Sequence, residues 1–154
     1  NPTALKAAAK INYPRDKMIG VWWSGAEEDV LPAGAAAKGF ISAGFNAPGA
    51  EFPVMKEIQK YVYAKGKGEF EDKSRFGSIY HTRGVVAGIV TAEAIRNAQA
   101  KFGKGKPITG EQMRWGIEHL NIDAARLKAL GATGLMPPLK VAEIEAATPV
   151  SRIH

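Results

Sequence analysis

The balance between strand and helix patterns constrains the fold of this chain most. A continuous apolar run of strand length, residues 18–23, lies between charged residues and Ser24-Gly25, which is typical of a strand buried on both faces. A weaker second strand is predicted for residues 38–45. A sheet of two or three strands cannot cover the apolar helix faces that the remaining sequence predicts, so further strands are expected to come from outside this chain.

Helical patterns dominate the remaining sequence. Asn1-Pro2 is a suitable cap and first-turn pair before the helix formers of residues 3–11, and residues 53–65 place apolar side chains at amphipathic spacing. Residues 78–102 carry the longest helical pattern, with a wide apolar surface, and are expected to form the central packing helix. The chain is therefore predicted to have an α/β fold that is rich in helix.

Two shorter helices are predicted near the end of the chain from their capping residues. Thr109 precedes Gln112 by three residues, which is the spacing of a capping box. Asp123 is a suitable cap for a further helix, and Gly131 is placed to end that helix in a left-handed conformation.

The composition fits a globular domain and excludes several classes of protein. The 154 residues are 45% hydrophobic and 23% charged, no apolar run approaches the roughly 18–20 residues that cross a bilayer, and no signal peptide is recognisable. If the protein is exported, its signal has been removed. The net charge of +6 comes from scattered lysines, and the densest basic segment, residues 101–107, is typical of a solvated loop, so no nucleic-acid partner is expected.

Candidates for chemistry are sparse. The chain has no Cys, and His81, His119 and His154 form no ligand pair, so no metal is expected. The carboxylates of residues 27–29 could form an acid/base pair or bind a hard cation, but after a strand they are more typical of a loop that favours a helix N-terminus. Nucleophile motifs and nucleotide-binding loops are absent, so the sequence predicts neither an enzyme nor a cofactor.

Two groups of side chains remain as candidates for ligand contact. Trp22 and Trp23 fall at the carboxyl end of the predicted strand, where open α/β sheets bind ligands. One indole can line a cleft while the other packs in the core, and burial of both fits the pattern equally well. Tyr80, His81 and Arg83 fall in the first turn of the longest helix, where backbone N–H groups favour anions, unless these side chains simply face water.

Several segments occur in a recognisable order: NPTALKAAAK, MIGVWWSGAEEDVLPAGAAAKGF, TRGVVAGIVTAEAIRNA, and ITGEQMRWGIEHLNID followed by LGATGLMPPLKV. Together they resemble the second half of a type I periplasmic solute-binding protein, the branched-chain amino acid or amide receptor family of ABC transporters. The resemblance covers residue 1 to about residue 141. It implies a two-lobed, doubly wound periplasmic-binding fold, with residues 1–44 in the C-terminal lobe, residues 45–140 in the N-terminal lobe after a hinge crossing at Phe45, and residues 141–154 as an unassigned tail.

The resemblance implies the substrate-binding component of an ABC importer. Such a protein is periplasmic, captures a small solute between its lobes and hands it to a membrane permease, without cofactor or covalent chemistry. The missing N-terminal half of the same fold would be a further partner and would supply the absent strands. Trp22, Trp23 and Ser24 would contact the ligand from one lobe, with Tyr80, His81 and Arg83 from the other.

One departure from the family pattern bears on the ligand class. Trp22 stands where the amino acid receptors carry a glutamate for the ligand's ammonium group. An indole stacks on rings and delocalised cations but does not neutralise an ammonium as a carboxylate does. An aromatic or other carboxylate, or an amide, is therefore favoured over an amino acid.

Two alternatives stay open at this point. In the first, the chain is an interaction or structural module that pairs through unprotected strand edges. In the second, it is a small α/β enzyme in which Glu27, Glu28 or His81 serves as a general base.

Overall fold

The computed structural model describes residues 1–69 and 72–141. In chain order its helices and strands are α1 (Pro2–Lys10), β1 (Ile19–Gly20), α2 (Glu27–Val30), β2 (Ile41–Ser42), α3 (Pro53–Tyr61), α4 (Ile79–Phe102), α5 (Gly110–Glu118), β3 (Asn121–Ile122), α6 (Ala124–Ala129) and β4 (Leu139–Lys140). Short 3-10 turns η1 to η4 lie between them at Arg15–Lys17, Leu31–Ala37, Tyr63–Lys65 and Lys73–Arg75. The chain is a mixed, helix-rich α/β structure with very short strands.

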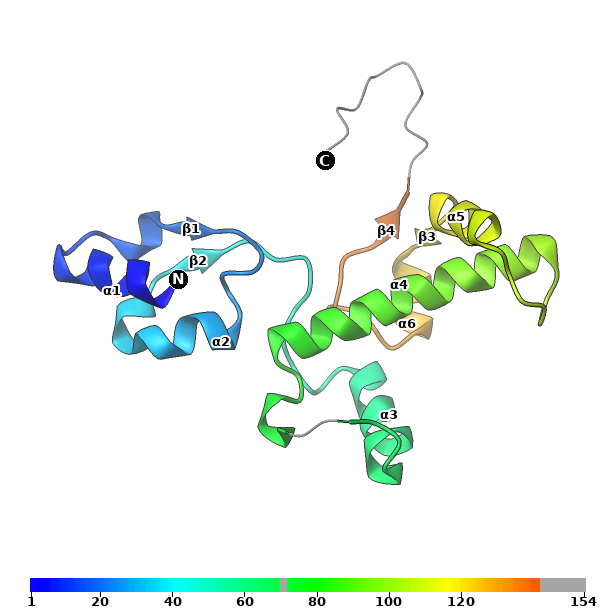
Figure 1. The fold of residues 1–154 in the computed structure, drawn as a ribbon, viewed down its shortest axis with the longest axis horizontal. Helices are drawn as coiled ribbons and strands as arrows, with labels where there is room; N and C mark the ends of the chain where they lie inside the picture. The colour runs from blue at the N-terminus through cyan, green and yellow to red at the C-terminus, as the bar shows by residue number, and fades with distance from the viewer. Residues whose placement is uncertain (70–71, 142–154) are drawn as a thin grey trace, which may run out of the picture.

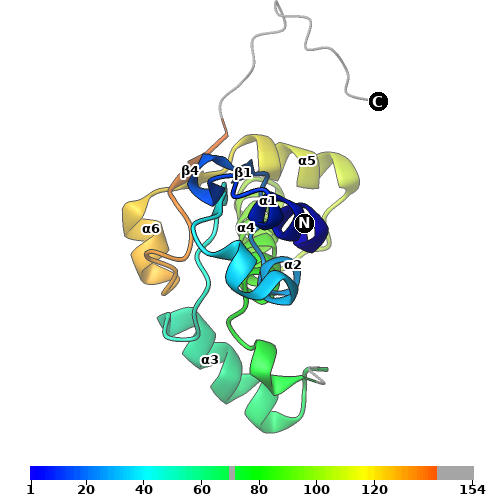
Figure 2. The same ribbon diagram turned by 90° about the vertical axis from the view of Figure 1, so that its left-hand side faces the viewer.

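Two groups of elements lie on opposite sides of one connecting segment (Figure 1). We call residues 1–44, with α1, β1, α2 and β2, the N-terminal part, and residues 45–141 the helical part. Figure 2 views the chain from the side of the N-terminal part, with α2 in front of α4. The first turn of α4 and the acidic helix α2 therefore face each other where the two parts meet.

The N-terminal part has a small core of its own. Leu5 and Ala8 on one face of α1 are buried together with Ala33 of η2, and Ala26 is buried just before α2. The parallel strands β1 and β2 pair Ile19 with Ile41 and Gly20 with Ser42. Neither strand has another neighbour in the described residues.

The prediction that residues 18–23 form a strand buried on both faces is wrong. Only Ile19–Gly20 is a strand, and a turn follows at once, closed by the Ser24 amide, which donates to the Val21 carbonyl at 2.8 Å. The side chains of Ile19 and Val21 are 76% and 62% exposed. A strand is buried on both faces only when layers cover both sides of its sheet. Here the paired residues Ile19 and Ile41 stay 76% and 49% exposed.

The second predicted strand, residues 38–45, is likewise reduced to Ile41–Ser42. The short helix α2 and the 3-10 turn η2 between the two strands were not predicted, because the small residues of that segment carry no periodic pattern. The described sheets are one parallel and one antiparallel pair, with β3 pairing Asn121 to Lys140 of β4. The doubly wound two-lobed fold is not established by these sheets.

The long helix α4 is the central packing helix of the helical part, as predicted. It begins at Ser78, whose hydroxyl accepts from the His81 amide. Helix α5 crosses it so closely that a side chain at Gly116 would clash with the backbone carbonyl of Ala94. The core beside α4 consists of Val86, Ala94, Leu120, Ile122, Leu127, Ala132, Leu135 and Met136.

The capping predictions for the last two helices are confirmed. The hydroxyl of Thr109 accepts from the Gln112 amide, and the Gln112 side chain accepts from the Thr109 amide. The carboxylate of Asp123 accepts from the backbone of α6, and Gly131 adopts φ 67° just after that helix. The helix predicted for residues 53–65 ends earlier, at Tyr61, and is followed by a 3-10 turn. The tail is described only as far as Val141, and residues 142–154 lie outside the described residues.

A buried carboxylate ties α6 to α4. Glu93 is 4% exposed and binds Arg126 with both oxygens, at 2.8 Å to Nε and 2.6 Å to Nη2. Arg96 also donates to Glu93, at 3.0 Å. The hydrogen bonds from Arg126, and then those from Arg96, hold the pKa of Glu93 below its ordinary value against the opposing effect of burial.

Candidate functional site

Arg83 is the centre of the contact between the two parts. Its Nη2 donates to the backbone carbonyl of Trp22 at 2.7 Å, across 61 residues of sequence. Its guanidinium carbon lies 5.0 Å from the ring centre of Trp22 and 5.3 Å from those of Phe45 and Tyr80. These distances are those of cation–π contacts, so three aromatic rings surround one cation.

A patch of exposed rings surrounds this cation. Trp22 lies 4.3 Å from Trp23 and 5.2 Å from Phe45, measured between ring centres and with tilted planes. Trp23 is 55% exposed, and Trp22, Phe45 and Tyr80 are each close to 40% exposed. We call Trp22, Trp23, Phe45, Tyr80 and Arg83 the aromatic–guanidinium cluster. Partly solvent-exposed aromatic rings around a cation offer a ligand both a stacking surface and a charge.

One donor in the cluster is unused. The Nε of Arg83 is buried and has no hydrogen-bond partner among the described residues. A buried N–H without an acceptor costs free energy, so an acceptor supplied from outside would stabilise it. The Nε–H is one of the N–H groups through which arginine binds carboxylates.

The acidic helix α2 contacts the first turn of α4 beside the cluster. The Tyr80 hydroxyl donates to the carboxylate of Asp29 at 2.8 Å, and this hydrogen bond is the main reason that the pKa of Tyr80 is raised. The same hydroxyl lies 3.3 Å from the carbonyl oxygen of Trp23. Glu27 accepts from the Ile79 amide at 3.0 Å, so its carboxylate caps the N-terminus of α4. Residues 27–29 thus begin helix α2 rather than forming the expected solvated loop, and the carboxylates of Glu27 and Asp29 bind residues of α4.

Two of the predicted site residues face elsewhere. Ser24 is 6% exposed, and its hydroxyl donates back to the Val21 carbonyl at 2.6 Å. The Nδ1 of His81 accepts from the Gly77 amide at 3.0 Å, while its Nε2 lies 3.2 Å from the Tyr63 hydroxyl. Burial lowers the pKa of His81, which favours the neutral ring. The structure thus brings Trp22, Trp23, Tyr80 and Arg83 together but not Ser24 or His81.

Phe45 is the cluster residue that was not a candidate in the sequence. It lies between Arg83 and an apolar pocket of about 250 Å³, which is lined by Phe45, Val86, Val90, Met136, Pro137, Pro138 and Leu139. Its position at the end of the second predicted strand and its place beside the expected hinge crossing were the available signals. The pocket places apolar volume directly beside the charge of the cluster.

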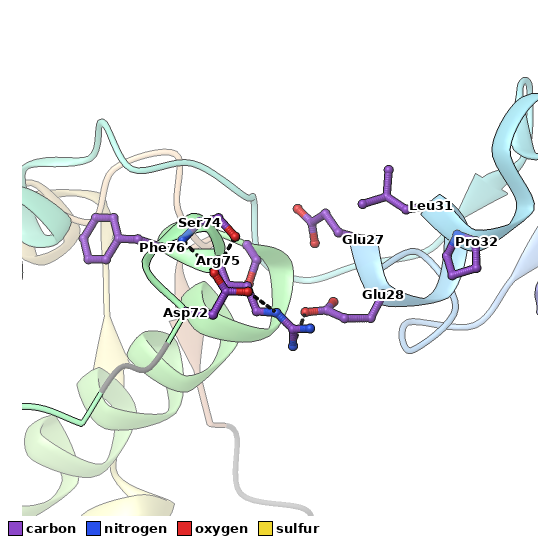
Figure 3. Close-up of a pocket in the computed structure, with 10 residues that line it drawn as sticks. Glu27, Glu28, Leu31, Pro32, Asp72, Ser74, Arg75 and Phe76 are labelled. Atoms are coloured by element: carbon purple, nitrogen blue, oxygen red, sulfur yellow. Dashed lines mark hydrogen bonds and ion pairs between the residues drawn. The ribbon is translucent and has the colours of Figure 1, made fainter.

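A second cavity, of about 590 Å³, opens beside the contact between the two parts (Figure 3). It shares no residue with the aromatic–guanidinium cluster. Arg75 spans it, with Nη1 at 3.3 Å from Glu28 and Nε at 3.2 Å from Asp72. The hydroxyl of Ser74 donates to Asp72 and holds the pKa of that carboxyl below its ordinary value. These charges already bind one another across the cavity.

Metal binding has no support from the described part of the chain. No group of three or more His, Asp or Glu side chains within residues 1–69 and 72–141 is arranged to hold a metal ion.

Comparison with known proteins gives a transport-related relative. No protein-family model matches the chain. No curated protein matches it significantly. A solved structure, described as the ABC transporter permease from the Pseudomonas fluorescens group, is 48% identical with a TM-score of 0.86. The chain is similar to an ABC transporter permease. The match covers 92% of this chain and 34% of that one, so the chain spans about one third of the length of the structure it matches.

This comparison corrects the expected identity. The prediction of a periplasmic solute-binding protein of the branched-chain amino acid or amide family is wrong, because the similar structure is called a permease, the membrane component of an ABC transporter. The expected role as the substrate-binding component of an importer and the expected periplasmic location are wrong for the same reason. The alternative of an interaction or structural module is not favoured either. The association with ABC transport is supported.

In the part of the chain that the structure describes, no helix is both long enough and apolar enough to span a bilayer.

Proposed function

We propose that the chain is part of an ABC transporter protein of the permease kind and acts in solute transport. The similarity to the Pseudomonas fluorescens group structure carries this proposal, since 48% identity extends over 92% of the chain. About two thirds of the similar protein lie outside the match. The activity, solutes and partners of the whole protein are therefore proposed for this chain by similarity.

The aromatic–guanidinium cluster is the place where this part of the permease contacts the transported solute. Its exposed rings and the unused Nε–H of Arg83 favour a planar ligand with a carboxylate or amide oxygen. The pocket beside Phe45 offers room for an apolar substituent of that ligand. An aromatic carboxylate combines all three features, and an aromatic amide is the second choice.

Contact with a solute in transport needs no covalent chemistry, and we propose that the chain is not an enzyme. The carboxylate of Glu27 is used as the cap of α4, and one oxygen of Glu28 binds Arg75. His81, the other candidate base, binds the backbone of Gly77 through Nδ1. These contacts favour structural roles for the side chains that a general-base mechanism would require.

The remainder of the protein is proposed to cover the sheet of the N-terminal part. Ile19 and Ile41, in two strands that have no outer neighbour in the described residues, and Val21, just after β1, are 49–76% exposed. Further strands or helices from the unmatched two thirds would bury these side chains. A boundary between two lobes at Phe45 stays a prediction.

A transport assay on the intact protein tests the site. The transporter containing this chain is reconstituted in proteoliposomes, and uptake of an aromatic carboxylate, an aromatic amide and an aliphatic amino acid is compared. Trp22→Ala and Arg83→Lys are each expected to lower uptake of the preferred solute at least tenfold, because one removes a ring and the other the planar N–H pair. Arg114→Lys, in an exposed pair with Glu118, is the matched control. Unchanged uptake in both site variants would exclude the cluster as the contact, and absence of any ATP-dependent uptake would exclude the transport role itself.

A further inference from the structure

The C-terminal end of α4 lies farthest from the N-terminal part (Figure 1), and the sequence there is rich in basic and aromatic residues. Lys101, Lys104 and Lys106 are exposed there, and residues 94–110 contain no acidic residue. Phe102 between them is 42% exposed. We call Lys101, Phe102, Lys104, Lys106 and Trp115 the basic–aromatic patch.

Helix α5 contributes the indole of this patch. Trp115 packs edge-on against Phe102 at 5.4 Å between ring centres and stacks on His119 at 3.9 Å. The ammonium of Lys101 lies 6.0 Å from the centre of the Trp115 ring. Because α5 is packed tightly against α4 at Gly116, the rings are held in fixed positions rather than on a loose loop.

The lysine loop is also held in place. The Gln99 side chain donates to the Lys106 carbonyl at 2.9 Å, and the turn uses positive φ at Gly103 and Gly105. The backbone of the loop is therefore tied to the last turns of α4. Helix α5 carries two acidic side chains: Glu118 binds Arg114 at 2.7 Å, and Glu111 lies in the first turn of the helix.

We propose that the basic–aromatic patch docks on an anionic phospholipid surface. Three ammonium groups that pair with no carboxylate among the described residues complement a negatively charged headgroup layer. Long lysine stems can lie along the interface while the charge stays hydrated. Phe and Trp rings favour the boundary between headgroups and acyl chains. An acidic protein surface would pair with the lysines but would offer no apolar contact to the exposed ring of Phe102. The inference rests on this patch alone and is independent of the solute site.

Vesicle sedimentation tests the proposal. The full chain is mixed with phosphatidylcholine vesicles with or without about one third phosphatidylglycerol, and the bound fraction is measured at low and high salt. Binding is expected only with the anionic lipid and is expected to weaken with salt. A triple variant with Lys101→Gln, Lys104→Gln and Lys106→Gln is expected to lose on the order of 100-fold in partition coefficient, at about a fivefold effect for each lysine.

A matched control removes the same charge elsewhere. Lys6→Gln, Lys10→Gln and Lys17→Gln change three exposed lysines of the N-terminal part and are expected to leave most of the binding intact. Phe102→Ser tests the ring and is expected to weaken binding severalfold without loss of the melting transition. Failure to bind anionic vesicles, or equal losses in the two triple variants, would overturn the proposal. So would binding to polyglutamate that exceeds binding to the vesicles, which would indicate an acidic protein partner.

Discussion

Replacing Glu93 by glutamine tests how the helical part is held together. In the native chain this nearly buried carboxylate accepts both N–H groups of Arg126 and a further one from Arg96. Glutamine keeps the shape but removes the charge and turns one acceptor into a donor that faces Arg126. Losing charge-assisted hydrogen bonds costs roughly 1.5–3 kcal/mol in measured series, and removing one partner of a fully buried pair costs more.

The structure places the expected loss toward the lower part of that range. The side chains of Arg126 and Arg96 are 34% and 52% exposed, so both cations can turn to water when the carboxylate is gone. We expect Glu93→Gln to lower the free energy of unfolding by about 2 kcal/mol, or the melting temperature by roughly 4–8 °C. Urea unfolding followed by circular dichroism measures the difference.

The pH dependence gives a second and sharper test. The pKa of Glu93 is depressed in the folded chain, so its contribution is present above the ordinary pKa of 4.5 and is lost as the pH falls through the folded value. The stability gap between the native chain and Glu93→Gln should therefore narrow on acidification below about pH 4.5. Glu118→Gln, the same change in an exposed pair with Arg114, is the control and should hardly move the unfolding midpoint. Equal midpoints for native chain and Glu93→Gln at neutral pH, or a gap that does not narrow in acid, would refute this account.

Three further predictions concern packing, capping and the contact between the two parts. Gly116→Ala should destabilise the chain by about 1–3 kcal/mol in urea unfolding, because its methyl group meets the backbone of Ala94, and an unchanged midpoint would show that α4 and α5 separate easily. Thr109→Ala should cost about 1 kcal/mol by the same measurement while Thr109→Ser costs much less, and equal losses would remove the capping box as the reason. Tyr80→Phe should abolish the titration of the one tyrosine whose pKa is raised through Asp29, observed by ultraviolet absorbance, and persistence of that late titration would contradict the assignment.

The sequence by itself determined the helices other than α2. Their signals are local: a cap such as Thr109 or Asp123 and its partner lie within three or four residues, and Gly131 ends a helix through its own backbone conformation. The long helical pattern of residues 78–102 needed only its own periodicity. These predictions hold because the interactions that decide them form between near neighbours in the chain.

Tertiary structure decided the strands and the site. A strand's length and burial depend on its neighbours. Among the described residues β1 pairs with β2 alone, and the apolar run around it stays exposed. The aromatic–guanidinium cluster joins Trp22 to Arg83 across 61 residues, and the contact of Tyr80 with Asp29 spans 51. No local sequence pattern predicts contacts between residues so far apart. For this reason Phe45 was missed as a member of the cluster, while Ser24 and His81, which face elsewhere, were expected to belong to the site.

The resemblance of segment order led to a receptor, whereas a similar solved structure is a permease. Residue order fixes which helices form, but it does not fix what those helices are assembled with. That assembly depends on surfaces, here the exposed sheet of the N-terminal part and the rings around Arg83, which exist only once distant segments pack together.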